Sequence, residues 1–297
     1  MLELKAIDVT YPGPPPFTAV RHVDLTVASG TTVGLVGESG SGKSTIARAA
    51  IGLTPVTSGT VTLDGKDVTN PRGRTLRELR RTAQLVFQDP YASLNPRMEI
   101  AMAVQEAVSV ASGERIGSAH CVRRATELLD RTGVPRAAMI RYPHQLSGGQ
   151  LQRVSIARAL ATEATMLILD EVTASLDVSV QARILNLLRE LQRDLDISML
   201  YISHDLSVVR YLTDHLYVMR HGEIVEEGSS DVVFGSPQHE YTRTLLAAVP
   251  TMGGNRWRSR REHASVPPLS EEAERAAPVT PPADSVEAPT PVPRGTR

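Results

Sequence analysis

The first 70 residues have the alternating pattern that is typical of β-strands. Apolar residues occupy every second position near the start of the chain, at Leu2, Leu4 and Ala6, and Val9 continues the same edge. A second apolar segment covers residues 20–27. Within residues 59–65 an Asp-Gly pair lies where two short strands would meet, and this dipeptide favours the tight turn of a hairpin. We therefore predict an N-terminal antiparallel β region.

Further along the chain, short apolar runs alternate with helical patterns. Residues 31–36 form an apolar run that leads through glycines into a helix-forming stretch at 43–53, and two more buried-strand candidates lie at 165–169 and 198–202. Between the last two, one apolar stripe repeats at helical spacing: Ile184, Leu187, Leu188, Leu191 and Leu195. Strand, helix and strand in this order predict an α/β fold with a parallel sheet and right-handed crossovers.

Two other segments differ from this α/β pattern. Residues 91–164 have helical periodicity and little strand signal, which predicts a helical subdomain inserted between sheet strands. Residues 251–297 hold eight of the chain's 20 prolines and one aromatic residue, too little apolar surface to offset chain entropy. We therefore predict a domain at 1–250 and a disordered Pro-rich tail at 251–297. A basic cluster in the tail is interpreted as a solvated linker, with contact to an anionic membrane surface as the alternative: Arg256, Arg258, Arg260 and Arg261.

Composition narrows the possible partners and the compartment. The 297 residues carry a formal net charge of −1, which argues against a nucleic-acid partner because such proteins usually have a basic surplus. Cys121 is the single cysteine, so an internal disulfide and a CxxC metal site are excluded, and a reducing compartment fits. No apolar run reaches the length that spans a bilayer, and the N-terminus lacks a secretory signal pattern. We expect a soluble, cytoplasmic chain.

The strongest local motif is GESGSGKST at residues 37–45, which matches G-x-x-x-x-G-K-[ST] between an apolar strand and a helix. Its glycines let successive backbone N–H groups turn inward around an anion, and the helix N-terminus adds partial positive charge. We predict that Lys43 reaches the β- and γ-phosphates, Ser44 coordinates Mg²⁺ and Thr45 lies against the α-phosphate. The predicted phosphate-binding residues are Gly37, Ser39, Gly40, Gly42, Lys43, Ser44 and Thr45.

Two acids, Asp170 and Glu171, follow directly after the apolar run at 165–169. A carboxylate at the carboxyl end of a parallel strand points to the crevice where ligands bind in α/β sheets. Asp170 is the predicted Mg²⁺ partner, through water, and Glu171 is the predicted general base for the attacking water. The alternative interpretation is that the two acids only mark the end of the strand and have no role in chemistry.

A second anion-binding pattern, LSGGQ, occupies residues 146–150. Ser147, Gly148 and Gly149 open a helix, and Gln150 follows them. One chain cannot readily wrap both patterns around one nucleotide. We therefore predict two chains arranged head to tail, each serine–glycine loop closing on the phosphate loop of the other.

Taken together, these motifs resemble those of the ATP-binding-cassette (ABC) ATPases over residues 2–250. The resemblance implies a P-loop NTPase with a RecA-like parallel sheet core, an N-terminal antiparallel β subdomain and an inserted helical subdomain. It also implies roles for Gln88 in catalysis and Mg²⁺ binding, for His204 at the γ-phosphate and for Asp177 near the nucleotide. Tyr11 would stack on adenine, with a core tyrosine at a strand end as the alternative.

Two longer segments are similar to the ATP-binding subunits of oligopeptide, dipeptide and nickel permeases. They are VFQDPYASLNPRM at 86–98 and SPQHEYTRTLLAAVP at 236–250. Many members also hold an iron–sulfur cluster on a C-terminal cysteine group, and the single Cys121 predicts that this chain has no such cluster. Val172 stands where the family usually has proline after the glutamate.

The resemblance implies an ATP-hydrolysing subunit of an importer, with Mg²⁺ as its cofactor. Its expected partners are a second ATPase subunit, identical or related, two membrane permease subunits and, indirectly, an extracytoplasmic solute-binding protein. The expected location is the cytoplasmic face of the membrane. The cargo stays open among peptides, nickel, opines and related solutes. A non-transport ABC ATPase, a P-loop kinase or GTPase and a regulatory nucleotide sensor are the alternatives; the −1 charge disfavours the first and LSGGQ the second.

Overall fold

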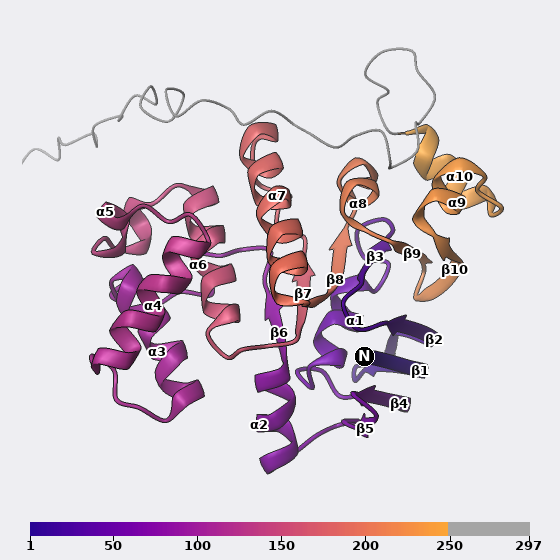
Figure 1. Ribbon diagram of the computed structural model, residues 1–297. Coiled ribbons are helices and arrows are strands. Elements are labelled where there is room, and N and C mark those ends of the chain that lie inside the picture. Colours follow the sequence, from indigo (N-terminus) through magenta and orange to yellow (C-terminus); the bar gives the residue numbers. More distant parts are fainter. Residues whose placement is uncertain (249–297) are drawn as a thin grey trace, which may run out of the picture. The chain divides into compact units, whose positions relative to one another are not determined.

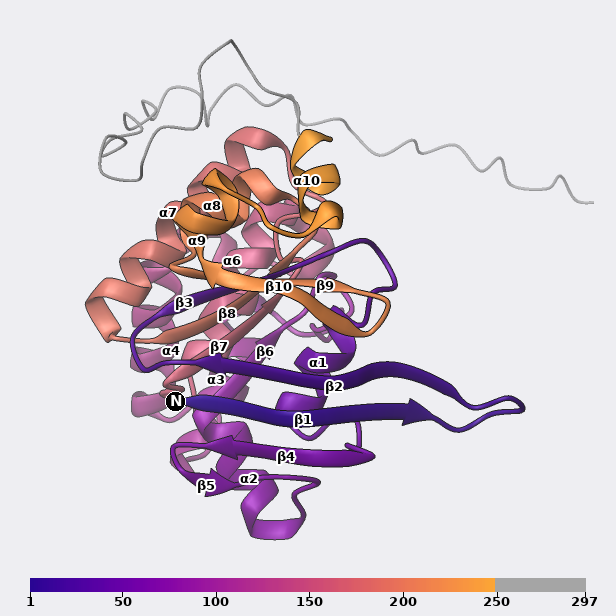
Figure 2. The ribbon, with the colours of Figure 1, turned by 90° about the vertical axis from the view of Figure 1, so that its right-hand side faces the viewer.

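The structure, a computed structural model, describes residues 1–248. The tail predicted at 251–297, with its basic cluster, lies outside the described residues. The described residues contain a four-stranded and a six-stranded sheet, seen side by side in Figure 2.

The four-stranded sheet is the predicted N-terminal antiparallel region. Its order is β2-β1-β4-β5, with β1 at Leu2–Tyr11, β2 at Phe17–Val27, β4 at Ser58–Leu63 and β5 at Lys66–Asp67. The turn between β4 and β5 is the predicted Asp-Gly pair, and both of its residues have positive φ, 50° and 75°, as the tightest hairpin turns require.

The alternation predicted for β1 is wrong at Ala6, whereas Val9 is buried as predicted. Leu2 and Leu4 are buried, but the next buried residues are Ile7 and Val9, because the register with β2 shifts between Leu4 and Ile7. Ala6 has φ 47° at this irregularity, so its side chain does not continue the apolar face. A bulge of this kind moves the following residues by one position and cannot be deduced from the alternation.

The six-stranded sheet has the order β10-β9-β3-β8-β7-β6. The strands are β3 (Thr32–Val36), β6 (Ala83–Val86), β7 (Met166–Asp170), β8 (Ser198–Ser203), β9 (His215–Arg220) and β10 (Glu223–Ser229). All neighbouring pairs are parallel except β9 and β10. The predicted α/β fold class is therefore correct, and the carboxyl ends of β3, β8, β7 and β6 meet at one edge.

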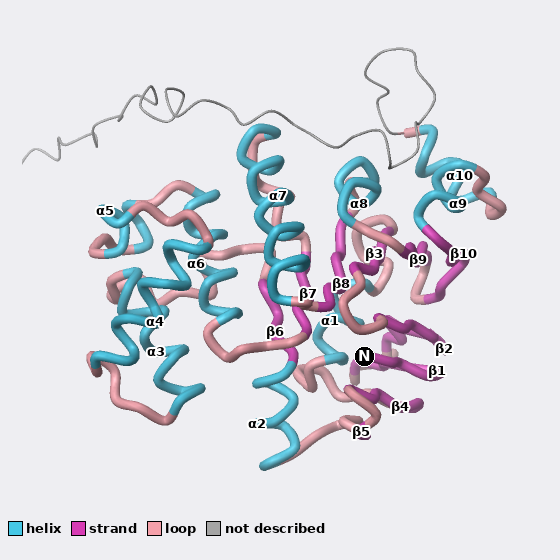
Figure 3. Tube along the Cα trace, in the orientation of Figure 1, coloured by secondary structure: helices cyan, strands magenta, loops and turns pink. Residues whose placement is uncertain are grey.

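Helices surround this sheet and fill the segment between β6 and β7. That segment contains α3 (Ile100–Ser112), α4 (Ala119–Arg131), α5 (Arg136–Met139), a 3₁₀ turn at Pro143–Gln145 and α6 (Gly148–Leu160), with no strand (Figure 3). The other helices are α1 (Lys43–Ala50), α2 (Gly73–Thr82), α7 (Val178–Leu195), α8 (Leu206–Leu212), α9 (Ser230–Gly235) and α10 (Glu240–Ala247). In Figure 1 the group α3–α6 lies beside the β6 edge of the sheet.

Two hydrophobic cores lie on opposite faces of the six-stranded sheet. Successive residues of β7 alternate between them: Leu167 and Leu169 belong to the core with α7 and α8, and Met166 and Ile168 to the core with α1, β1 and β2. The central strands are apolar on both faces because both are covered, as parallel sheets require. Cys121 is fully buried in the first core, as a packing residue would be.

The two sheets are also joined by hydrogen bonds. The backbone N–H of Arg21 in β2 donates to the carbonyl of Gly222 at 2.8 Å. The N–H of Thr26 donates to the buried hydroxyl of Tyr217 in β9 at 3.2 Å. Within residues 1–248, no helix is long and apolar enough to cross a membrane.

Candidate nucleotide-binding site

Four neighbouring strands bring the predicted site residues to one edge of the six-stranded sheet. The loop at 37–42 follows β3, His204 follows β8, Asp170 ends β7, and Gln88 follows β6. Because β3, β8, β7 and β6 are consecutive and parallel, residues separated by more than a hundred positions in sequence meet there. This is the edge at which α/β sheets bind ligands.

The glycine loop forms a tight turn between β3 and α1. Gly42, the residue before α1, has φ 110°, and a Cβ atom there would lie 2.5 Å from the carbonyl oxygen of Ala19. Only glycine fits this close approach in this backbone conformation. At Gly40 a Cβ atom would meet nothing within 4 Å. The loop is thus packed on one side and open on the other.

Lys43 is the buried cation of this loop, with an exposed fraction of 4%. Its ammonium donates to the carbonyls of Gly37 at 2.8 Å and Glu38 at 2.7 Å. Burial lowers the pKa of Lys43, and the nearby carboxylates of Glu171 and Asp170 oppose that shift. The carbonyl pair holds the ammonium inside the loop, where it can contact an anion.

Ser44 and Asp170 join the glycine loop to β7. The Ser44 hydroxyl donates to Asp170 Oδ1 at 3.0 Å, across 126 positions of sequence. Burial raises the pKa of Asp170, the Ser44 hydrogen bond lowers it, and the Glu171 charge raises it further. Two adjacent oxygen donors, one of them a carboxylate, fit Mg²⁺, which prefers oxygen ligands and keeps several waters and phosphate oxygens around it.

Glu171 has an unusual backbone for a non-glycine residue, with φ 50°. Such strain persists only where surrounding structure imposes it. The Glu171 N–H donates to the carbonyl of Ile202 at 3.0 Å, and its carboxylate lies 3.4 Å from His204 Nδ1. The side chain is 16% exposed, while that of His204 is 56% exposed. A half-buried carboxylate is therefore fixed beside the Ser44–Asp170 pair, with a solvent-accessible imidazole against it.

Two other predicted residues flank this centre. The Tyr11 and Thr45 hydroxyls share a hydrogen bond of 3.3 Å, so Tyr11 lies next to the start of α1. Gln88 is exposed in the loop after β6, and Val86 two residues before it pairs with Leu169. Within residues 1–248, its side chain makes no hydrogen bond to Ser44 or Asp170. The structure therefore brings Gln88 to the same edge without joining it to the predicted metal ligands.

The serine–glycine loop opens α6, as its pattern predicts. The Ser147 hydroxyl accepts the Gln150 N–H at 3.3 Å, and the Gln150 side chain accepts the Ser147 N–H at 3.1 Å. This reciprocal pair satisfies helix-end donors. Asp177 caps α7 in a similar way, accepting the N–H of Val180 at 2.9 Å. At Gly149 a Cβ atom would lie 2.3 Å from Val180 Cγ1, so the starts of α6 and α7 touch.

The serine–glycine loop and the phosphate loop lie apart in one chain. Figures 1 and 2 both draw α6 separate from α1. In the described part of the chain, no hydrogen bond connects residues 147–150 with residues 37–45. Ser147 and Gly148 are exposed.

Sequence reasoning missed two anchors of the phosphate loop. The Gly222 N–H donates to the Ser41 carbonyl at 2.9 Å, and the Glu38 N–H donates to the Tyr241 hydroxyl at 3.0 Å. Tyr241 lies in the segment 236–250 that is similar to the permease subunits, but no spacing rule indicates a contact across 203 positions.

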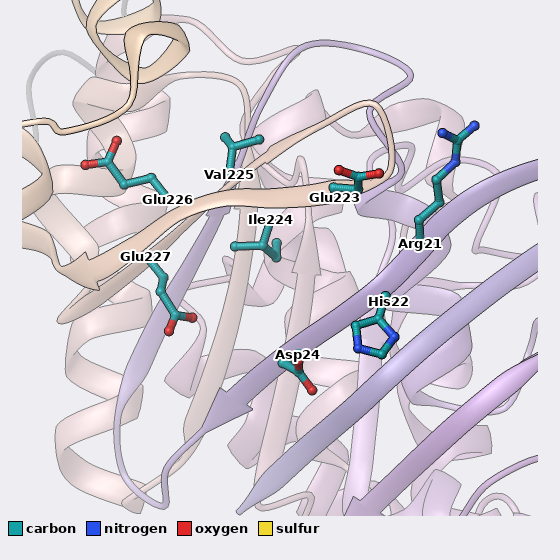
Figure 4. A pocket seen from close by; sticks show the side chains of 8 residues that line it. All are labelled: Arg21, His22, Asp24, Glu223, Ile224, Val225, Glu226 and Glu227. Atoms are coloured by element: carbon teal, nitrogen blue, oxygen red, sulfur yellow. The ribbon is translucent and has the colours of Figure 1, made fainter.

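A groove of about 560 Å³ lies elsewhere, between β2 and β10 (Figure 4). Its lining includes Arg21, His22 and Asp24 from β2 and residues 223–227 from β10. No predicted site residue lines it, so it is separate from the nucleotide-binding candidate.

Comparison with known proteins agrees with this arrangement. Residues 20–174 match the ABC transporter family. The oligopeptide transport ATP-binding protein OppF of Lactococcus lactis is 44% identical over 271 residues, covering 89% of this chain and 84% of that protein.

Two solved structures are also similar. One is the dimeric ATP-binding cassette MJ0796 bound to ADP and Pi, with TM-score 0.71 and 29% identity over 77% of this chain and 99% of that one. The other is cbiO1 of Clostridium perfringens, with TM-score 0.70 and 28% identity over 84% of this chain and 95% of that one. With the glycine loop, the acid pair and the serine–glycine loop all in place, this chain belongs to the ABC transporter family.

Proposed function

We propose that the chain is the ATP-hydrolysing subunit of an ABC importer and powers uptake of peptides or a related small solute through separate permease subunits. The observation that carries the proposal is the 3.0 Å hydrogen bond between Ser44 and Asp170, with the Glu171 carboxylate next to it. A phosphate loop, two metal-type oxygen donors and a candidate base at one sheet edge are the parts that phosphoryl transfer needs. The similarity to an oligopeptide transport protein favours peptides among the open cargoes.

ATP and Mg²⁺ are the proposed ligands of the site. In this proposal the backbone of residues 37–45 and Lys43 bind the phosphates, while Tyr11 stacks on adenine. Ser44, Asp170 and Gln88 would hold Mg²⁺, which neutralises charge on the phosphate oxygens when bound. Lys43 would exchange its carbonyl partners, Gly37 and Glu38, for phosphate oxygens.

Glu171, His204 and Gln88 are the proposed catalytic residues. Glu171 would accept a proton from the attacking water, because its carboxylate lies beside the donor pair and is only 16% exposed. His204 contacts that carboxylate at 3.4 Å and would orient it while facing the γ-phosphate. In residues 1–248 Gln88 makes no hydrogen bond to Ser44 or Asp170, and it would join the site when nucleotide is bound.

The complete site is proposed to need a second chain. The exposed Ser147 and Gly148, with Gly149, Gln150 and Asp177, would close on nucleotide held by the phosphate loop of a partner ATPase subunit, identical or related. The dimeric state of MJ0796 supports this arrangement by similarity. The remaining proposed partners are two membrane permeases and, indirectly, a solute-binding protein, which would hold the chain at the cytoplasmic face of the membrane.

The decisive experiment replaces the proposed base. In Glu171→Gln, ATP binding should persist, turnover should fall by about 10²–10⁴-fold, and an ATP-bound dimer should accumulate. Phosphate release, nucleotide binding and light-scattering mass on the full chain measure the three effects. Glu171→Asp, with a shorter carboxylate, is the matched control and should retain more turnover than the glutamine variant.

The outcomes separate the proposal from its alternatives. Undiminished hydrolysis by Glu171→Gln would remove this residue from the base role. ATP binding by the wild-type chain without turnover, even beside its membrane partners, would favour a regulatory nucleotide sensor. Turnover without a permease partner in the cell would favour a non-transport ABC ATPase.

A further inference from the structure

The phosphate loop is held from outside by the last elements of the described chain. The turn between β9 and β10 contributes a backbone contact, from the Gly222 N–H to the Ser41 carbonyl. Helix α10 contributes a side chain: the Tyr241 hydroxyl accepts the Glu38 N–H at 3.0 Å. Both contacts come from beyond residue 174, where the match to the ABC transporter family ends.

Tyr241 is fixed from several sides. Its side chain is 5% exposed, and the guanidinium carbon of Arg220 lies 4.8 Å from the centre of its ring. Its own N–H donates to the His239 ring at 3.1 Å. Burial raises the pKa of Tyr241, so the phenol stays protonated at neutral pH.

The start of α10 is attached to β10 through one carboxylate. Glu226 accepts the N–H of Gln238 at 2.7 Å and that of His239 at 3.0 Å. Figure 4 shows that the Glu226 and Glu227 side chains leave β10 in opposite directions. Glu226 therefore holds the start of α10 as well as lining the groove, and it sets the position from which Tyr241 reaches the loop.

Glu38 links this attachment to the phosphate-binding lysine. Its N–H is held by Tyr241, and its carbonyl accepts the Lys43 ammonium at 2.7 Å. One residue of the loop is thus bonded on one side to α10 and on the other to the cation that would contact phosphate. Without the Tyr241 hydroxyl, the Glu38 N–H loses this acceptor and the first turn of the loop has fewer restraints.

We infer that Tyr241 is a positioning residue for nucleotide binding, which holds the first turn of the phosphate loop ready before nucleotide arrives. This inference rests on the proposed ATPase function of the site. Because bound phosphates themselves order the loop, the hydroxyl acts mainly on the nucleotide-free state. Apparent affinity falls when the binding-competent state is less populated, while the bound geometry is unchanged.

The test removes one oxygen atom. In Tyr241→Phe, the Kd for ADP and the KM for ATP should rise about three- to tenfold, and kcat should stay within about twofold of wild type. Calorimetry with ADP on the full chain measures Kd without requiring turnover. Thermal unfolding confirms that the variant is folded under the assay conditions.

Tyr217→Phe is the matched control. Tyr217 is 6% exposed and its hydroxyl also accepts a backbone N–H, from Thr26 at 3.2 Å, but at the joint between the two sheets. Both variants should lose stability, whereas only Tyr241→Phe should lose nucleotide affinity. Equal loss of affinity in the two variants would reduce Tyr241 to a general structural role and overturn the inference.

Linkage supplies a second readout. If Tyr241 favours nucleotide binding, nucleotide must strengthen the docking of α10 by the same factor. ADP should therefore slow amide hydrogen exchange in Tyr241–Ala247 of the wild type and have a smaller effect there in Tyr241→Phe. Wild type that binds no ADP would contradict the proposed function; wild type and Tyr241→Phe with equal Kd would contradict the inference alone.

Discussion

At the scale of single residues, the candidate site holds two neighbouring carboxylates that are largely buried, those of Asp170 and Glu171. Asp170 is 6% exposed and lies near the Glu171 carboxylate, so burial and like charge together raise its pKa, against the hydrogen bond from Ser44. When the pKa of an acid is higher in the folded than in the unfolded state, the folded state binds more protons at pH values between these two pKa values. Stability therefore falls as pH rises from the unfolded pKa of 3.8 through the folded value.

Asp170→Asn should for this reason stabilise the nucleotide-free protein. We expect the free energy of unfolding at pH 7 to rise by about 1 kcal/mol, while Mg²⁺-dependent hydrolysis is lost. Denaturant titration at several pH values measures the difference, which should shrink as wild-type Asp170 becomes protonated in acid. A variant less stable than wild type at pH 7 would show that the charge of Asp170 is balanced by its neighbours.

Motif spacing predicts which residues gather at the sheet edge but not how each is held. The motifs predict that Ser44 and Asp170 share a metal ion, and the structure places the Ser44 hydroxyl 3.0 Å from Asp170 Oδ1. The positive φ of Glu171 and the Tyr241–Glu38 bond were not predicted, because both depend on tertiary contacts with no local sequence pattern. Such contacts join residues that are far apart in the sequence, and neither helical nor strand periodicity relates their positions.

At the scale of elements, the starts of α6 and α7 depend on each other. Each helix begins with its own side-chain cap, Ser147 or Asp177, and both caps follow from residue type and position. Their mutual contact, Gly149 against Val180, does not follow from either pattern alone. The same holds for the bulge in β1, where the register with β2 and not the alternation decides which side chains are buried.

Gly149→Ala tests the contact between these two helices. Alanine favours a helix over glycine by about 1 kcal/mol, but its Cβ atom would lie 2.3 Å from Val180 Cγ1. We expect a net loss of about 1–3 kcal/mol in the free energy of unfolding, because the overlap exceeds the gain in propensity.

Two further variants identify the cause. In Gly148→Ala the new Cβ atom would meet Leu176 at an ordinary 3.4 Å, so its effect on stability should be smaller. Val180→Ala in the Gly149→Ala background should recover part of the loss, since it removes the overlapping methyl group. Additive losses in the double variant would mean that the two residues are not coupled.

At the scale of the whole described molecule, the six-stranded sheet packs against one hydrophobic core on each of its two faces. Adjacent residues of β7 face opposite cores, and the hydrogen bonds of Arg21 and Thr26 tie the second sheet to the first. If the sheet unfolds, neither core keeps the surface against which it packs. The described residues should therefore unfold as one unit.

Leu167→Ala and Ile168→Ala test this cooperativity from opposite faces. Each residue is fully buried, so each truncation should cost about 2–5 kcal/mol and lower the melting temperature of one common transition. Scanning calorimetry and far-UV circular dichroism should give coincident curves for both variants. Separate melting of one core in either variant would contradict the cooperative unfolding of the two cores.

The burial of Cys121 has a practical consequence for labelling experiments on this chain. Cys121 belongs to α4, its side chain is 0% exposed in the core, and it is the single cysteine of the 297-residue chain. Maleimide dyes and bifunctional crosslinkers should consequently leave the native polypeptide unmodified. A thiol introduced at an exposed position outside the nucleotide site, such as Val110 or Val232, can then carry a fluorophore or spin label without background, so distances to these positions become measurable in the otherwise unchanged sequence.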